Sequence, residues 1–450
     1  MKFIHYIFIL FFVFTLAACG DNKNGPEKVV STGNPESSST ETPLEDSAEN
    51  GACSTLSEDA CHEQSPVNED PCNANCSSDS PPGIDPDPVV TPTPPSEHVF
   101  RVGPTRIYRV PSEVASIVPD GALVEIDAGV YSGDVAVWNA DNLTIRGVGG
   151  MAHLRAEGAN AQGKGTWIIN GKNTTLEYIE FSGSSVPGGN GAGIRHQGGD
   201  LTIRYCFFHD NENGILTDSH PSSHILIEYS EFASNGYGDG FSHNMYIGNI
   251  QRFTFQHNYS HHAKVGHNLK SRARENFILY NRIMDEASGI SSYAIDLPNG
   301  GLSVVMGNVL QQGPDTGNSS IVSYAAEGGS NPSQVFYFVN NTVINDRSAG
   351  KFVQVSGTPT LKIINNLFAG AGNTPTGSGI SDNLSVGFDT FVDTNNYDYR
   401  LIAGSPAIDT GVQIATVGTL NLSPVWEYVH RANRKERILQ NILDIGAHEF

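Results

Sequence analysis

Two short segments, 24 residues apart, carry side chains that transfer protons and bind anions. Residues 243–248 read HNMYIG, residues 267–272 read HNLKSR, and a third segment, residues 293–297, reads YAIDL. Imidazole, phenol and amine groups act as general acids and bases, and cationic groups stabilise negative charge that develops during a reaction. These residue types predict proton-transfer chemistry on an anionic substrate, provided that the fold brings the three segments together.

Strand alternation indicates how the segments could meet. The apolar residues inside them would face the core: Met245, Leu269 and Ile295. Because neighbouring side chains of a strand point to opposite faces, Tyr246, Lys270 and Asp296 would then point outward in one column. If the segments form adjacent strands, each member of the column lies about 4.8 Å from the next.

The column and its flanks supply the candidate site residues. We expect catalytic roles for Lys270, His267, Tyr246 and Arg272. We expect substrate contacts from Arg274, Asn244, Asn268, Asp296, His243 and Tyr237. Such a set suits cleavage or epimerisation of a uronate-containing polysaccharide, because removal of the proton at C5, next to the sugar carboxylate, creates an enediolate that needs cationic stabilisation.

The hypothesis assigns a role to each group. Lys270 or His267 abstracts the C5 proton. Tyr246 donates a proton to the leaving oxygen or to the opposite face of the ring. Arg272 and Arg274 hold the substrate carboxylate.

Each of these residues also has a purely structural interpretation. The two asparagines could be turn residues, and the two histidines, which alternate in phase with the core residues, could be hydrogen-bonded near the core. The basic residues could form a solvated strip that balances nearby acids. A metal site would draw on His257, His261, His262 and His267. We predict no metal there, because His257 adjoins a turn.

The chain from about residue 122 to 370 repeats with a period near 27 residues. One position, here called position zero, is occupied by Val148, Ile179, Cys206, Ser230, Asn258, Asn281, Asn308, Asn341 and Asn366. The residue three places earlier is apolar in all nine repeats, and segments such as 201–204 alternate apolar and polar residues. This pattern predicts stacked coils of short strands, with the five asparagines in an amide ladder and Ser230 and Cys206 as small substitutes.

The repeat resembles the right-handed parallel β-helix of polysaccharide lyases, epimerases and related surface proteins, over roughly residues 100–450. The resemblance implies an all-β, single-stranded right-handed parallel β-helix with a helical cap at its amino-terminal end. Residues 111–118 are expected to form the short helix of that cap. Residues 404–409 and 444–449 resemble closing segments of bacterial β-helices, so we expect structural roles for their acids.

Two local features resemble enzymes of this group. His267 on its Gly266-His267-Asn268 turn is similar to the histidine-bearing strand of mannuronan C5-epimerases, and the Lys270 and Arg272 pair resembles β-helical alginate lyases. The Asp-Pro-His pattern of the epimerases is absent, because Val265 and Gly266 precede His267. The acidic calcium-binding cluster of several lyases is not evident either, so we predict no cofactor and leave calcium as an alternative that no clear acidic cluster supports.

The sequence leaves several functions open. A β-eliminative lyase and a C5-epimerase share the same first step. The alternatives are a non-catalytic glycan-binding or envelope surface protein, and a glycoside hydrolase. A hydrolase needs two carboxylates across a scissile bond, and the column clearly supplies only Asp296.

The first 18 residues have the features of an export signal. Lys2 precedes an apolar run from Ile7 to Leu16, and small residues lead to Cys19. The LAAC sequence at 16–19 resembles the lipobox of bacterial lipoproteins, which implies cleavage before Cys19 and lipidation of that residue. Gly20 follows the cysteine, which in such lipoproteins favours the outer membrane. We therefore expect an outer-membrane lipoprotein on the periplasmic or the surface face, anchored through Cys19.

Residues 19–98 are expected to be a disordered tether before the β-helix domain at 99–450, because their Ser-, Pro- and acid-rich composition buries too little apolar surface to order. Four cysteines in the tether are expected to form two disulfides of undecided pairing: Cys53, Cys61, Cys72 and Cys76. The chain has 48 Asp+Glu against 26 Lys+Arg, a formal charge of −22, which argues against a nucleic-acid partner. We expect a monomer that binds an acidic polysaccharide.

Overall fold

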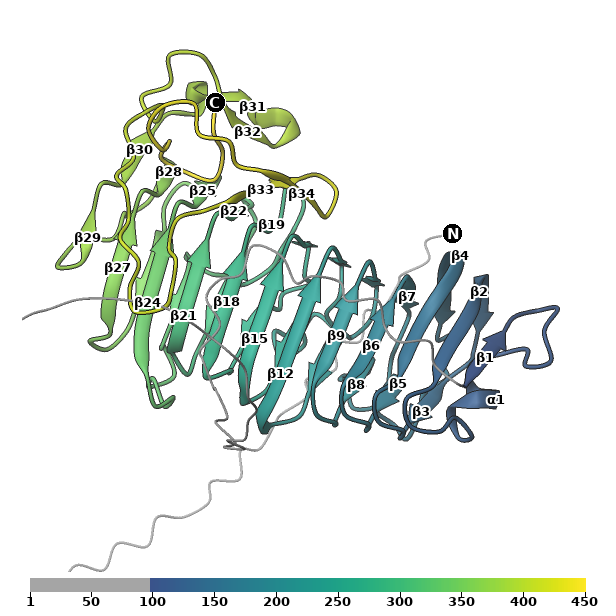
Figure 1. Ribbon diagram of the computed structural model, residues 1–450. Helices are drawn as coiled ribbons and strands as arrows, with labels where there is room; N and C mark the ends of the chain where they lie inside the picture. The colour runs from purple at the N-terminus through teal and green to yellow at the C-terminus, as the bar shows by residue number, and fades with distance from the viewer. Residues whose placement is uncertain (1–97) are drawn as a thin grey trace, which may run out of the picture. The chain divides into compact units, whose positions relative to one another are not determined.

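A computed structural model describes residues 98–450, which form a parallel β-helix (Figure 1). The predicted signal, the lipidated Cys19, the four cysteines of the tether and nearly all of the tether itself lie outside the described residues. Within residues 98–450, no helix has both the length and the apolar character needed to cross a bilayer.

One face of the β-helix is a nine-stranded parallel sheet, to which each coil contributes one strand. Its strands are β3 (Ala136–Trp138), β5 (Gly165–Ile169), β8 (Ala192–His196), β11 (Asn213–Thr217), β14 (Met245–Ile247), β17 (Lys270–Ser271), β20 (Ile295–Leu297), β23 (Ser320–Tyr324) and β26 (Lys351–Val355). Because equivalent residues of successive coils pair across this sheet, a column of side chains on its outer face follows the axis of the coils.

The remaining strands of the coils form a 21-stranded parallel sheet with two faces. The first face contains β1 (Val99–Val102), β2 (Leu123–Ser132), β4 (Thr144–Arg155), β6 (Thr174–Glu177), β9 (Leu201–Arg204), β12 (His220–Glu228), β15 (Ile250–Gln256), β18 (Glu275–Leu279), β21 (Gly301–Met306), β24 (Gln334–Val339), β27 (Thr360–Ile364) and β29 (Ile380–Ser381). The second contains β7 (Ile179–Ser182), β10 (Phe207–His209), β13 (Glu231–Ala233), β16 (Tyr259–His261), β19 (Arg282–Met284), β22 (Val309–Gln312), β25 (Thr342–Asn345), β28 (Leu367–Gly370) and β30 (Leu384–Val386). Strand β4 joins the faces, because it pairs with both β6 and β7.

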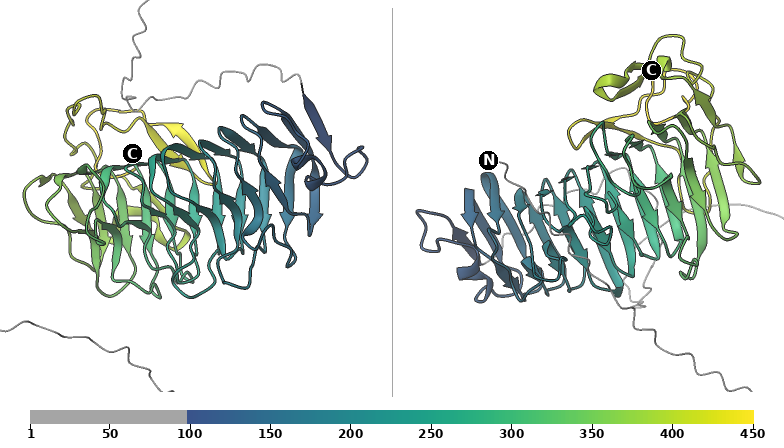
Figure 2. Two further views of the ribbon diagram at one scale, coloured as in Figure 1. Left: turned by 90° about the horizontal axis from the view of Figure 1, so that it is seen from below. Right: turned by 180° about the vertical axis from the view of Figure 1, so that it is seen from behind.

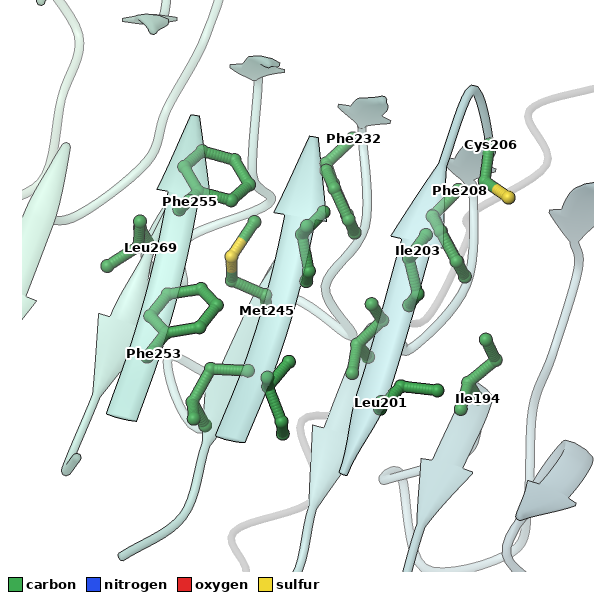
Figure 3. Close-up of a cluster of buried hydrophobic side chains, with 14 of the residues drawn as sticks. Ile194, Leu201, Ile203, Cys206, Phe208, Phe232, Met245, Phe253, Phe255 and Leu269 are labelled. Atoms are coloured by element: carbon green, nitrogen blue, oxygen red, sulfur yellow. The ribbon is translucent and has the colours of Figure 1, made fainter. Parts of the chain in front are cut away.

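Apolar side chains from all three faces fill the interior of the coils. The nine residues three places before position zero lie in register with one another, as predicted, and each is fully buried. Figure 3 shows Leu201, Met245 and Phe255 projecting into this shared interior. The short helix α1 (Ser112–Ala115) lies in the stretch where a helix was predicted, and its Val114 and Ala115 are buried.

The predicted amide ladder is present at position zero. The side-chain amide of each asparagine donates to the side-chain oxygen of the asparagine in the next coil, from Asn258 to Asn366, at 2.9–3.2 Å. Ser230 and Cys206 continue the ladder toward the amino terminus with backbone N–H donors, as predicted. Asn383 adds a further rung that the repeat spacing did not reveal, accepting from Asn366 at 2.8 Å.

The first repeat departs from the predicted register. Ala152, rather than Val148, occupies position zero, because Ala152 pairs with Ile179. Residues 148–151 are exposed between the part of β4 that pairs with β6 and the part that pairs with β7, and Gly149 and Gly150 have φ values of 81° and 145°. The assignment of Val148 was wrong because spacing alone does not distinguish this glycine-rich extension from a regular turn of the coil.

The carboxy-terminal segment folds back over the outer faces of the later coils (Figures 1 and 2). It contains η1 (Phe388–Thr390), β31 (Phe391–Asp393), η2 (Thr394–Asn396), β32 (Asp398–Leu401), β33 (Trp426–Val429) and β34 (Asn433–Glu436). Phe391, Tyr399 and Tyr428 form one apolar cluster with outward-facing residues of the second face, including Tyr259. The acids of residues 444–449 make structural contacts, since Asp444 accepts from backbone N–H groups and Glu449 pairs with a buried arginine.

Candidate functional site

Strands β14, β17 and β20 carry the column predicted from the sequence. Tyr246 pairs with Lys270, and Lys270 pairs with Asp296. The apolar residues beside them are fully buried, so alternation places the three polar side chains on the outer face. The predicted column is confirmed. It continues toward the amino terminus through Leu216 and Arg195, the latter paired with an aspartate on the next coil.

Asp296 is buried rather than open to solvent. Together with Tyr246, Lys270, Arg272 and Glu327 it forms the outer-face surface that is here called the groove. Its side chain is only 5% exposed, and its Oδ2 lies 3.3 Å from Lys270 Nζ. Burial raises the pKa of the Asp296 carboxyl, and the adjacent Lys270 opposes that shift. The outward direction predicted for this residue is correct, but direct substrate contact is restricted by the side chains above it.

Glu327 is a central residue of the groove that sequence reasoning missed. It comes from the loop between β23 and β24, and its two oxygens lie 3.3 Å from Lys270 Nζ and 2.7 Å from a terminal nitrogen of Arg272. The pKa of Glu327 is lowered, although partial burial acts in the opposite direction, because Arg272 and Lys270 stabilise its charged form. Its side chain is 48% exposed, so the carboxylate bridges two cations at a position that solvent reaches.

Tyr246 and Arg272 form a second contact across the column. Arg272 Nε donates to the phenol oxygen at 2.7 Å, and its guanidinium carbon lies 5.8 Å from the centre of the tyrosine ring. Arg272 also donates to Asn299. The guanidinium is therefore held in place while it faces both the phenol and Glu327.

His243 and His267 stack on one another at the edge of the column, with ring centres 4.5 Å apart. The backbone N–H of His267 donates to His243 Nδ1 at 3.0 Å, which makes Nδ1 an acceptor. His267 Nε2 lies 3.6 Å from Asp296 Oδ2, and its Nδ1 has no hydrogen-bond partner among the described residues. The two rings are buried, but they lie beside Tyr246 and Asp296 rather than among the core aliphatics.

Both histidines are neutral at pH 7. Burial, reinforced by the charge of Lys270, lowers the pKa of His243 to about 3. Burial, His243 and Lys270 together lower the pKa of His267 well below its usual value. A neutral imidazole has a nitrogen that can accept a proton, but the lowered pKa makes each of these rings a weaker base than an exposed histidine.

The expectation that Asn244 and Asn268 contact substrate was wrong. Both side chains are fully buried in a second amide ladder, where Asn244 Nδ2 donates to Asn268 Oδ1 at 3.0 Å. The ladder continues from Asn235 to Asp285. These amides fix the starts of β14 and β17 from inside the coil, so they position the column without reaching the groove.

The two remaining predicted residues, Arg274 and Tyr237, lie beside the column rather than in it. Arg274 follows β17 at the bend toward β18, and its guanidinium makes no hydrogen bond or ion pair with another described residue. Tyr237 is 63% exposed on the loop before β14, where its backbone N–H donates to Ser242. Neither residue joins the network of Lys270, Arg272 and Glu327.

The four histidines considered for a metal site do not converge on one point, although His261 Nδ1 lies 2.7 Å from His262 Nδ1. His257 is buried in an aromatic stack between Tyr229 and Tyr280, with ring separations of 5.2 and 5.5 Å. His261 instead contacts Glu231 on the second face, at 3.0 Å. Within residues 98–450, the one group of three possible metal ligands with mutually close ligand atoms is His153, Glu180 and His209, which lies outside this groove.

The comparisons with known proteins support the fold. No protein-family model and no curated protein matches the chain. Among solved structures, pectate lyase Pel9A is similar with a TM-score of 0.53 and 14% sequence identity, and the match covers 79% of this chain and 96% of that one. The chain is therefore a parallel β-helix that resembles pectate-lyase-like proteins.

Proposed function

We propose that the protein acts on a uronate-containing polysaccharide by removing the proton at C5, as a β-eliminative lyase or a C5-epimerase. The observation that carries the proposal is the bridge formed by Glu327, whose carboxylate lies between Lys270 and Arg272. A carboxylate of the protein already occupies a position where the carboxylate of a sugar acid would meet two cations. The pectate-lyase-like fold of the chain is consistent with this substrate class.

The proposed reaction begins at the carbon next to the sugar carboxylate. A base takes the C5 proton, and the charge that moves onto the carboxylate is stabilised by Lys270 and Arg272. In elimination, the electrons of the C5–H bond form a double bond between C4 and C5, the C4–O bond breaks, and the leaving oxygen takes a proton. In epimerisation, C5 takes a proton on the opposite face and no C–O bond breaks.

Two groups can serve as the base. His267 is neutral at pH 7, and its Nε2 lies 3.6 Å from Asp296 Oδ2. Lys270 stands in the column beside Tyr246, but its ammonium is paired with two carboxylates and must lose a proton before it can act. Tyr246, which accepts a hydrogen bond from Arg272, is the proposed proton donor.

Glycoside hydrolysis fits the groove less well. Asp296 and Glu327 do form a carboxyl pair with pKa values shifted in opposite directions. However, both face the same Lys270 ammonium at 3.3 Å, so a cation rather than a sugar linkage lies between them. Non-catalytic binding of an acidic glycan is the second candidate, since the paired state of Lys270 suits an anion-binding role.

The test is to incubate the purified full chain with alginate, pectate, glucuronan and glycosaminoglycans. Elimination creates a conjugated alkene that absorbs ultraviolet light, and NMR detects epimerisation without cleavage. We expect one of these two products from at least one polymer. Retained binding of a polymer without either product would establish the binding function and contradict the proposed chemistry.

A further inference from the structure

A cluster of His153, Glu180 and His209 lies on the outer side of three successive coils, away from the groove. The residues belong to β4, β7 and β10, and each side chain is about one-fifth exposed. His153 Nδ1 lies 3.4 Å from Glu180 Oε1, and His209 Nε2 lies 3.0 Å from the same oxygen. One ligand atom from each residue lies within 4.8 Å of the other two.

The separations of 3.4 and 3.0 Å from Glu180 are close to the spacing of ligands around one small divalent ion. Ligand atoms bound at about 2.0–2.2 Å in a tetrahedral site lie about 3.4 Å from one another. Two imidazoles and one carboxylate are ligands of Zn²⁺ and similar late transition metals, whereas Ca²⁺ takes six to eight oxygens. The three groups therefore have the chemistry and the reach of a zinc-type site with an open fourth position.

The surrounding residues orient both imidazoles toward this point. His209 Nδ1 contacts Asp210 Oδ2 at 2.9 Å, so its Nε2 faces Glu180. His153 Nε2 contacts the Ser182 hydroxyl at 2.7 Å, which leaves Nδ1 toward the same carboxylate. Metal-binding histidines are oriented in this way by partners on the second ring nitrogen.

His209 also has more acceptors than a neutral ring can satisfy. Both of its nitrogens face carboxylate oxygens, and a neutral imidazole carries only one N–H. Both contacts are satisfied either by an imidazolium or by a cation bound between Nε2 and Glu180. Lys264 Nζ pairs with Asp210 Oδ1 at 3.1 Å, whereas Glu180 has no lysine or arginine partner among the described residues.

We propose that His153, Glu180 and His209 form a binding site for a Zn²⁺-type divalent ion that links three coils and leaves one coordination position for water or an exogenous ligand. The ion binds between the coils in the folded chain only, because the unfolded chain does not hold the three ligands together. Binding is therefore expected to raise the thermal unfolding temperature.

The test is titration of the chelator-treated full chain with Zn²⁺ by calorimetry and with Co²⁺ by visible absorption. We expect His153→Gln and His209→Gln each to weaken binding at this site by at least about 100-fold, and Asp210→Asn to weaken it about 10- to 100-fold. The exposed His224 serves as the matched control, because His224→Gln should leave the titration unchanged. Ca²⁺ should not displace Co²⁺.

Metal binding by the cysteines of residues 1–97 is common to the parent chain and the variants. The difference between their titrations therefore reports on this site alone. Circular dichroism of each variant checks that the β-helix is intact. Equal Zn²⁺ and Co²⁺ titrations for the parent and a folded His153→Gln/His209→Gln double variant would overturn the proposal. So would a Co²⁺ spectrum that Ca²⁺ abolishes.

Discussion

The Glu327 carboxylate pairs with the Lys270 ammonium at 3.3 Å, although 57 residues separate them in the chain. Lys270 lies on the regular sheet, whereas Glu327 lies on a loop two coils further along. The pairing places a displaceable anion over a fixed cation. We infer that Glu327 competes with the carboxylate of an acidic ligand for Lys270 and Arg272.

Removing this competition should strengthen ligand binding. Glu327→Gln keeps the size of the side chain but not its charge, so we expect several-fold tighter binding of anionic oligosaccharides, measured by calorimetry. Stability should change by less than about 1 kcal/mol, because the residue is half exposed. Glu157→Gln, which alters an equally exposed ion pair elsewhere, is the control. Weaker binding by Glu327→Gln would show instead that Glu327 supports the ligand site.

Substitutions at the two candidate bases should separate their roles. Arginine retains a positive charge but does not give up a proton near neutral pH. If Lys270 is the base, Lys270→Arg loses about 10²- to 10⁴-fold in turnover while binding persists. If His267 is the base, His267→Gln shows that loss and Lys270→Arg retains most of the activity.

Steady-state kinetics and thermal unfolding of each variant provide the measurement. Lys172→Gln, at an exposed position outside the groove, controls for the general loss of a lysine. Full activity in both His267→Gln and Lys270→Arg would exclude both residues as the base.

The amide ladder at position zero should contribute strongly to the free energy of unfolding. Asn281 donates to Phe255 O and Asn308 Oδ1, and its own oxygen accepts from Asn258, all in a fully buried setting. Asn281→Ala leaves these buried partners without their hydrogen bonds. We therefore expect the free energy of unfolding, measured in urea, to fall by about 3 kcal/mol or more. Asn383→Ala, at the half-buried end of the ladder, should cost less. Equal losses at both positions would contradict the ladder's role.

Buried histidines should make the fold sensitive to acid. Burial lowers the pKa values of His243, His257 and His261 to about 3 in the folded protein. The unfolded chain takes up protons on these residues below about pH 6.5. The free energy of unfolding should therefore be highest above that pH, as far as these histidines contribute to it, and should fall as the pH drops toward 3.

His257→Phe should reduce this dependence, because phenylalanine can occupy the aromatic stack without titrating. The exposed His224→Phe should not. The free energy of unfolding is measured in denaturant at several pH values. The same pH dependence in His257→Phe as in the parent chain would contradict the lowered pKa of His257.

The proposed lipid anchor can be tested independently of activity. In a bacterial host that matures lipoproteins, the parent chain should fractionate with membranes and carry acyl chains on Cys19 by mass spectrometry. Cys19→Ala should appear in the soluble fraction, because the acyl chains supply the membrane affinity. Absence of acyl chains from Cys19 in the membrane fraction of the parent chain would refute this anchor.

The repeat in the sequence predicted most of the scaffold for a physical reason. Residues in equivalent places of successive coils must be buried or hydrogen-bonded in the same way, so Ile203 and Asn281 have counterparts at regular spacing. The same regularity placed Tyr246, Lys270 and Asp296 in one column.

The parts that could not be predicted are those that break the repeat. Glu327 lies on a loop whose path is not set by the coil period. Asn244 and Met245 are consecutive yet both buried, because strand alternation does not hold at the corner between two faces. The outer faces covered by the carboxy-terminal segment, as at Tyr259, depend on contacts between residues more than 100 positions apart.

The central claim is that the groove removes the C5 proton of a uronate, and proton NMR of the polymer in deuterated water tests it most directly. The account predicts that the parent chain either replaces H5 with deuterium or generates the H4 signal of an unsaturated end, and that neither change occurs with a Lys270→Gln/His267→Gln double variant. Intact H5 signals in every uronate polymer that the folded parent chain binds would contradict it.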